Sequence, residues 1–150
     1  MRGAIVGTMA LGTTEKAELL GRSELFEGAP ASALGRLAER AGERSFADGE
    51  YLVRQGQAGT GLWVIVSGGA RVVRGSEELS RLGPGQFLGE LAVIDQQPRL
   101  ASVVATGPTV ALGLASWDLF TEVEKDPELA AAMLRGLAHR LRQVIGEAHH

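Results

Sequence analysis

The stretch Leu62-Trp63-Val64-Ile65-Val66-Ser67-Gly68-Gly69-Ala70-Arg71-Val72-Val73 decides the fold of this chain. Its first five residues are apolar and rich in β-branched and aromatic side chains, which predicts a strand in the middle of the core. Ser67-Gly68-Gly69 reads as a turn, and the run that follows it is again typical of a strand. The stretch therefore predicts a β-hairpin whose first strand is buried.

Further short runs of the same kind surround this hairpin. Eleven of the 21 glycines fall within positions 42–89 and separate the runs from one another. Short strands at near-regular spacing with glycine turns favour an antiparallel sandwich or barrel. The other predicted strands cover residues 51–53, 79–82, 102–105 and 110–114.

Helical patterns flank this β-rich region on both sides. Apolar residues recur at helical spacing before residue 42, and again after residue 115. Pro127 begins a second, longer C-terminal helix, because proline is favoured at the first helical position. We predict an α+β fold in one domain, residues 14–148. It comprises N-terminal helices (14–42), an antiparallel β-barrel of the double-stranded β-helix or jelly-roll type (43–114), and two C-terminal helices (115–148).

The last helix carries an apolar seam. Its members are spaced alternately by four and three residues, as in a short coiled coil: Ala130, Leu134, Leu137, Leu141, Val144 and Ala148. This seam predicts a homodimer through the C-terminal helix. The alternative is a helix packed on its own domain, for which Leu129 and Met133 are available. The two interpretations are compatible, because one helix can use two faces.

The composition excludes several classes of protein. A length of 150 residues fits one domain, and a net charge of −3 disfavours direct nucleic-acid binding. The absence of cysteine excludes disulfide scaffolds and thiol catalysis. Of the three histidines, His149 and His150 stand at the chain end, where a tag remnant is as plausible as a ligand site. We therefore expect neither a metal site nor an enzyme.

The chain start shows neither a targeting segment nor a membrane segment. The apolar run of residues 1–6 stops at Gly7, and no stretch approaches the roughly 18 apolar residues that span a bilayer. Residues 1–13 are predicted to be a flexible lead. A cytoplasmic location without membrane contact is expected.

The segment Gly83-Pro84-Gly85-Gln86-Phe87-Leu88-Gly89-Glu90-Leu91-Ala92-Val93-Ile94-Asp95-Gln96-Gln97-Pro98-Arg99-Leu100-Ala101-Ser102-Val103 carries the candidate chemistry. Gly89 allows close backbone approach to a ligand, and the amides that begin a helical turn after it suit a phosphate. Arg99 can bind a phosphate bidentately. The Glu90 carboxylate can accept a hydrogen bond from a sugar hydroxyl. The alternative is that Glu90 and Arg99 are surface charges on a solvated loop.

The order Gly-Glu-Leu-Ala, then Pro-Arg-x-Ala-Ser-Val, resembles the phosphate-binding cassette of the cyclic nucleotide-binding domain family. That family includes the ligand-binding domains of catabolite activator protein and of the cyclic-AMP-dependent protein kinase regulatory subunit. Two strand patterns strengthen the resemblance, one in residues 49–56 and one in residues 62–68. The resemblance covers residues 25–144. It implies a regulatory domain that binds a cyclic nucleotide and needs no cofactor.

The resemblance assigns roles residue by residue. Gly89, Leu91 and Ala92 would face the cyclic phosphate, Glu90 would accept from the ribose 2′-hydroxyl, and Arg99 would pair with the phosphate. The other expected residues would surround the ligand. Ala101 and Ser102 would line the pocket, and Val73 and Leu82 would form its apolar wall. The base would be covered by Leu137, Arg140 or Leu141. Leu100 stands where a hydroxyl is associated with guanine recognition. It therefore favours cyclic AMP over cyclic GMP.

The leading hypothesis is a cyclic nucleotide sensor in which ligand shifts a conformational population. A hinge at residues 117–126 would let the last helix close over the base and signal to a downstream effector whose identity is unknown. One alternative is a degenerate domain that keeps the fold for protein interaction without binding nucleotide. Another, a metal-binding cupin-like barrel, is disfavoured because residues 43–114 contain no histidine.

Overall fold

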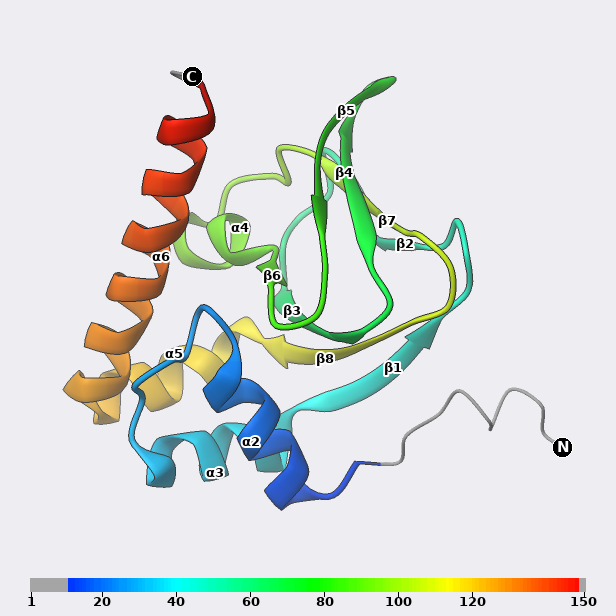
Figure 1. Cartoon of the computed structure of the whole chain (residues 1–150). Helices are drawn as coiled ribbons and strands as arrows, with labels where there is room; N and C mark the ends of the chain where they lie inside the picture. The colour runs from blue at the N-terminus through cyan, green and yellow to red at the C-terminus, as the bar shows by residue number, and fades with distance from the viewer. Residues whose placement is uncertain (1–10, 149–150) are drawn as a thin grey trace, which may run out of the picture.

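The computed structural model describes residues 11–148 (Figure 1). Most of the predicted lead, together with His149 and His150, lies outside the described residues. The elements follow one another in the order α2 (Thr13–Arg22), α3 (Ala31–Arg40), β1 (Gly42–Phe46), β2 (Tyr51–Val53), β3 (Gly61–Ser67), β4 (Ala70–Arg74), β5 (Glu77–Leu82), β6 (Phe87–Leu88), α4 (Glu90–Asp95), β7 (Ser102–Ala105), β8 (Thr109–Ala115), α5 (Ser116–Lys125) and α6 (Pro127–Ala148).

The strands form two antiparallel four-stranded sheets, ordered β1-β8-β3-β6 and β2-β7-β4-β5. Consecutive strands lie in different sheets, except β4 and β5. With helices at both ends of the chain, this is the predicted α+β jelly-roll architecture. The predicted barrel needs correction, because no pairing among the described strands joins the two sheets. The chain changes sheet through turns and loops, so the result is an open sandwich.

The predicted hairpin at Ser67-Gly68-Gly69 is wrong. β3 pairs with β6 and β8, whereas β4 pairs with β5 and β7, so this turn carries the chain from one sheet to the other. Gly68 has φ +82°, and a Cβ there would collide with the backbone at Pro108 and Thr109. The glycines therefore serve a tight corner between sheets, and the true hairpin joins β4 to β5 across Gly75 and Ser76.

β3 is buried in the middle of the core, as predicted. It lies between β8 and β6, and its side chains alternate between two apolar clusters. Leu62 and Val64 face the helices, whereas Trp63 and Ile65 lie between the two sheets. The first cluster joins the sandwich to the helices, and the second holds the two sheets together.

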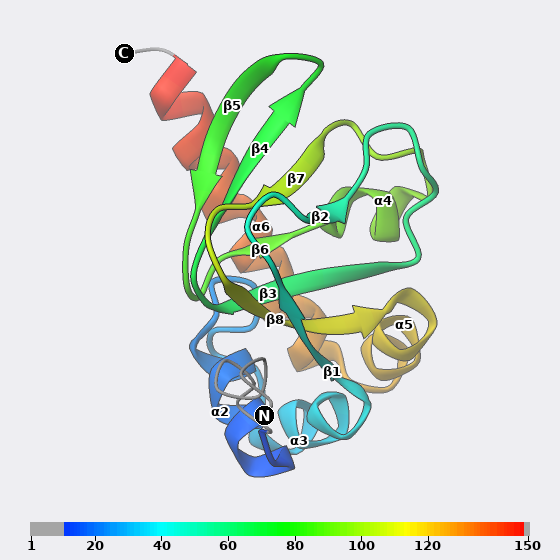
Figure 2. The same ribbon diagram turned by 90° about the vertical axis from the view of Figure 1, so that its right-hand side faces the viewer.

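The helices gather at one end of the sandwich (Figures 1 and 2). α2, α3 and α5 lie beneath the β1-β8-β3-β6 sheet, and α6 runs from them along the side of the sandwich past α4. The face of α6 toward the domain includes Leu129, Ala132, Met133 and Gly136, which are buried. The expectation that Leu129 and Met133 pack on the chain's own domain is therefore confirmed.

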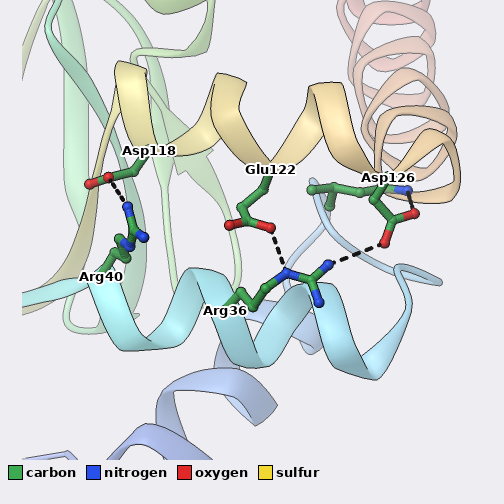
Figure 3. Close-up of polar contacts among 6 residues, drawn as sticks. Arg36, Arg40, Asp118, Glu122 and Asp126 are labelled. Carbon is green, nitrogen blue, oxygen red and sulfur yellow. Dashed lines mark hydrogen bonds and ion pairs between the residues drawn. The ribbon is translucent and has the colours of Figure 1, made fainter.

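Charged side chains join α3 to α5 (Figure 3). Arg36 Nε lies 2.6 Å from Glu122 Oε1, and its Nη2 lies 3.6 Å from Asp126 Oδ2 at the junction of α5 and α6. Glu122 is buried, so Arg36 compensates a carboxylate that is removed from water. Arg40 makes a more exposed pair with Asp118 at 2.8 Å.

Replacing Arg36 with Met should destabilise the fold. The substitution leaves the buried Glu122 carboxylate without its cation, and we expect a loss of about 1–3 kcal/mol in the free energy of unfolding, measured by urea denaturation. Arg40→Met is the matched control and should cost less, because Arg40 is more exposed than Arg36 and its partner Asp118 is less buried than Glu122. Equal losses in the free energy of unfolding of the two variants would show that the burial of Glu122 does not determine the strength of its contact with Arg36.

Candidate functional site

A hollow of about 970 Å³ opens between α4, the sheet formed by β2, β7, β4 and β5, and the outer half of α6. Its lining comprises apolar residues from the strands, charged residues that include Glu90 and Arg99, and residues of α6. Its apolar wall includes Val72, Leu82, Leu88 and Val103. A cavity with an apolar wall and a few convergent charges is the usual form of a small-molecule site.

Gly89 fixes the geometry at the start of α4. Its φ of +86° is left-handed, and a Cβ there would collide with the Arg99 guanidinium. Only glycine fits both demands without strain. The chain can therefore turn sharply from β6 into α4, whose first amides have no partner within the helix.

Arg99 is held against this turn by two backbone carbonyls. Its Nη1 donates to Gly89 O at 2.9 Å, and its Nη2 donates to Gly61 O at 2.7 Å. Burial lowers the pKa of Arg99, and attraction to Glu90 offsets this in part. A fixed guanidinium beside the start of α4 can bind an anion bidentately.

Glu90 is the acid of the site and is only 8 % exposed. Its Oε1 lies 3.4 Å from Arg140 Nη1, which reaches across from α6. Burial raises the pKa of the Glu90 carboxyl, while attraction to Arg140 and Arg99 acts in the opposite direction. Arg140 also stacks on Phe87, with its guanidinium carbon 3.5 Å from the ring centroid.

Most of the candidate residues named from the sequence share this hollow. They lie in α4, in the loop after it and on two flanking elements: Gly89, Glu90, Leu91, Ala92, Arg99, Leu100, Ala101, Leu82 and Arg140. The alternative interpretation, that Glu90 and Arg99 sit on a solvated loop, does not fit the burial of Glu90 or the two carbonyl bonds of Arg99.

Four candidates do not line the hollow. Ser102 lies between two lining residues on β7, and its Oγ instead accepts a hydrogen bond from the Gln55 amide at 2.9 Å. Val72 lines the wall in place of Val73, beside an irregularity in the β4–β5 register. On α6, Leu137 packs against the helical core and Leu141 is exposed.

Sequence reasoning missed several residues of the site. Phe87 carries the stacked Arg140, and Gln143 and Val144 of α6 line the hollow. Helical spacing could have indicated Gln143 and Val144, since they follow Arg140 by three and four residues. Phe87 had no comparable signal, because its role depends on how α6 crosses β6.

The residues of the hollow suit a ligand that combines an anion, a hydroxyl and an apolar body. Arg99 and the start of α4 offer the anion site, Glu90 offers an acceptor, and the strands offer the apolar wall. Among residues 11–148, no group of three or more acidic or histidine side chains could hold a metal ion. No helix in that range has the length and apolar character needed to cross a bilayer.

Comparison with known proteins finds similarities in sequence and in fold. The family model described as cyclic nucleotide-binding domain matches residues 43–126. A CRP-like cAMP-activated global transcriptional regulator of Mycobacterium tuberculosis is 31 % identical over 131 residues, 84 % of this chain and 58 % of its own. The cAMP-dependent protein kinase type II regulatory subunit of Drosophila melanogaster is 40 % identical over 80 residues, 51 % of this chain and 21 % of its own.

Solved structures show the same fold. The catabolite activator protein of Thermus thermophilus superposes with a TM-score of 0.73 and 31 % identity, over 85 % of this chain and 62 % of that one. The regulatory domain of Toxoplasma gondii PKA, crystallised with cAMP, superposes with a TM-score of 0.72 and 24 % identity, over 87 % and 50 %. The chain spans less than two thirds of each of these relatives.

The raised pKa of Glu90 predicts a pH-dependent stability. The folded protein holds this proton to a higher pH than the unfolded chain does, so stability falls as pH rises from the ordinary carboxyl pKa to the raised one. Glu90→Gln removes this fall. The melting temperature of the variant minus that of the parent should therefore rise as the pH increases above the ordinary carboxyl pKa of about 4. A difference in melting temperature that does not change with pH would contradict the raised pKa of Glu90.

Proposed function

The chain belongs to the cyclic nucleotide-binding domain family, and from this premise we propose that it is a regulatory sensor that binds cyclic AMP, and cyclic GMP less well. The observation that carries the proposal is the pairing of a carbonyl-anchored Arg99 with the buried acceptor Glu90 across one hollow. The function of the domain is binding and regulation, without catalysis.

The proposed roles follow the placement of the groups. Arg99, with the amides of Leu91 and Ala92 after Gly89, would hold the cyclic phosphate. Glu90 would accept from the ribose 2′-hydroxyl. The sugar and base would lie against the apolar wall, and Arg140, Gln143 and Val144 would cover them from α6, since all three line the hollow.

The preference for cyclic AMP rests on Leu100. This side chain lines the hollow and is 65 % exposed, and it has no hydrogen-bonding group to offer guanine. A guanine donor facing it would stay unpaired once the site is desolvated, at a cost in affinity. Adenine would place no such unpaired donor against Leu100.

The signal would leave through α6. Arg140 joins this helix to Glu90, while Arg36 joins α3 to the α5–α6 junction at Asp126. A ligand that contacts Glu90 therefore acts on the helix that covers it. We propose that bound nucleotide shifts the resting position of α6 relative to the sandwich, which an effector or a second subunit would read.

Exposed apolar residues on α6 support the proposed homodimer. Leu134 and Leu141 are 67 % and 58 % exposed, and Ile145 lies one turn further along the same stripe. Leu137, which the sequence placed in the seam, instead packs against the helical core. The seam that we propose therefore uses Leu134, Leu141 and Ile145, which the described part of the domain leaves exposed.

Arg99→Ala tests the proposed nucleotide site. We expect a loss of about 2–5 kcal/mol in binding, or about 30-fold to several-thousand-fold in the Kd for cyclic AMP, measured by isothermal titration calorimetry on protein freed of nucleotide. Arg54→Ala is the matched control, because Arg54 stacks on Tyr51 outside this hollow. A parent that binds neither cyclic AMP nor cyclic GMP would instead support the degenerate domain that serves protein interaction.

Changing Leu134 and Leu141 to Glu together should give a folded monomer. The substitutions place charges on the exposed stripe and leave the buried face of α6 untouched, so dimerisation should be lost while the circular dichroism spectrum is retained. Sedimentation velocity measures the change, with His139→Glu as an exposed control off the stripe. A parent that sediments as a monomer, with and without cyclic AMP, would refute the dimer.

A further inference from the structure

Two buried side-chain atoms of charged residues in the described structure lack a hydrogen-bond partner. One is Arg140 Nη2 on α6, and the other is Glu24 Oε1 in the segment between α2 and α3. Leaving a buried polar atom unpaired costs about 1–3 kcal/mol, and more when the group is charged. The two groups have opposite charge, so each is the natural partner that the other lacks.

The fold places the backbone of the Glu24 segment against α6, one helical turn before Arg140. The Glu24 amide donates to Gly85 O at 3.0 Å, which fixes the segment against the sandwich. Gly136 packs directly on this segment, where a Cβ would come within 2.5 Å of Glu24 O. Arg140 follows Gly136 by one helical turn and so emerges on the same face of α6. Burial lowers the pKa of Arg140, and attraction to Glu90 and, to a smaller extent, to Glu24 acts in the opposite direction.

Arg140 contacts Glu90, but this contact leaves part of its guanidinium without a partner. Its contact with Glu90 is 3.4 Å long, whereas a charge-assisted hydrogen bond is about 2.7–2.9 Å. Glu24 has the opposite situation, with one buried oxygen and no donor. A movement of the guanidinium that paired Nη2 with Glu24 Oε1 would satisfy both unpartnered atoms and would release Glu90.

We propose that Glu24 is a positioning residue for nucleotide binding, which takes over Arg140 when the ribose 2′-hydroxyl takes Glu90. This inference rests on the proposed function. Glu24 belongs to the N-terminal helical region, so the exchange also links the occupied pocket to that region as well as to α6. Without Glu24, Arg140 stays on Glu90 and competes with the sugar.

Two ligands that differ by one hydroxyl test the exchange. In Glu24→Gln, the Kd for cyclic AMP should rise about three- to tenfold, the equivalent of one hydrogen bond. The Kd for 2′-deoxy cyclic AMP should not change, because that ligand makes no demand on Glu90. Glu27→Gln, an exposed glutamate of the same segment, is the matched control. Equal losses for both ligands, or no loss for either, would overturn the proposal.

A second measurement needs no nucleotide. In the Glu90→Gln background Arg140 keeps only Glu24 as an anionic partner, so adding Glu24→Gln should lower the melting temperature more than it does in the parent. Additive effects in this double-mutant cycle would overturn the pairing of Arg140 with Glu24. If the parent binds no cyclic nucleotide, the proposed function fails, while this cycle still decides whether Glu24 holds Arg140.

Discussion

The site depends on the two hydrogen bonds that Arg99 donates to the carbonyls of Gly61 and Gly89. They tie the first residue of β3 to the residue before α4 through one guanidinium. Gly59 and Gly89 permit this approach, since a Cβ at either position would collide with the α4 segment or with Arg99 itself. The cation is therefore placed by backbone geometry before any ligand arrives, which lowers the cost of ordering it on binding.

How far the sequence predicts this structure depends on how far apart the interacting residues lie along the chain. Gly89, Glu90 and Arg99 lie within one short segment, so their grouping could be predicted from spacing. The apolar run of β3 likewise predicts a central strand, because five apolar residues in a row require cover on both faces. The destination of the Ser67-Gly68-Gly69 turn could not be predicted, since a glycine turn suits a hairpin and a corner between sheets equally. Val72 and Val73 exchange roles because a register irregularity lies between them.

The helix α6 shows most clearly what a pattern leaves open. Its seven-residue repeat predicted one seam, but the helix has to satisfy the domain beneath it as well as any partner. The structure separates the two demands: Leu129, Met133 and Gly136 pack inward, while Leu134 and Leu141 remain exposed. Leu137 falls near the boundary between the two faces. Sequence spacing cannot assign such a residue, because the crossing angle of α6 decides on which side it lies.

The ion pairs of the described residues differ in length and in how completely their atoms are paired. Arg36 meets the buried Glu122 at 2.6 Å, which joins α3 closely to α5. Arg140, on the part of α6 that lines the hollow, has a long contact with Glu90 and an unpartnered nitrogen. Arg140 and Glu90 both line the hollow, so this incompletely satisfied contact lies where a ligand would meet it. Under the proposed function, a ligand that binds Glu90 acts on α6 through this contact.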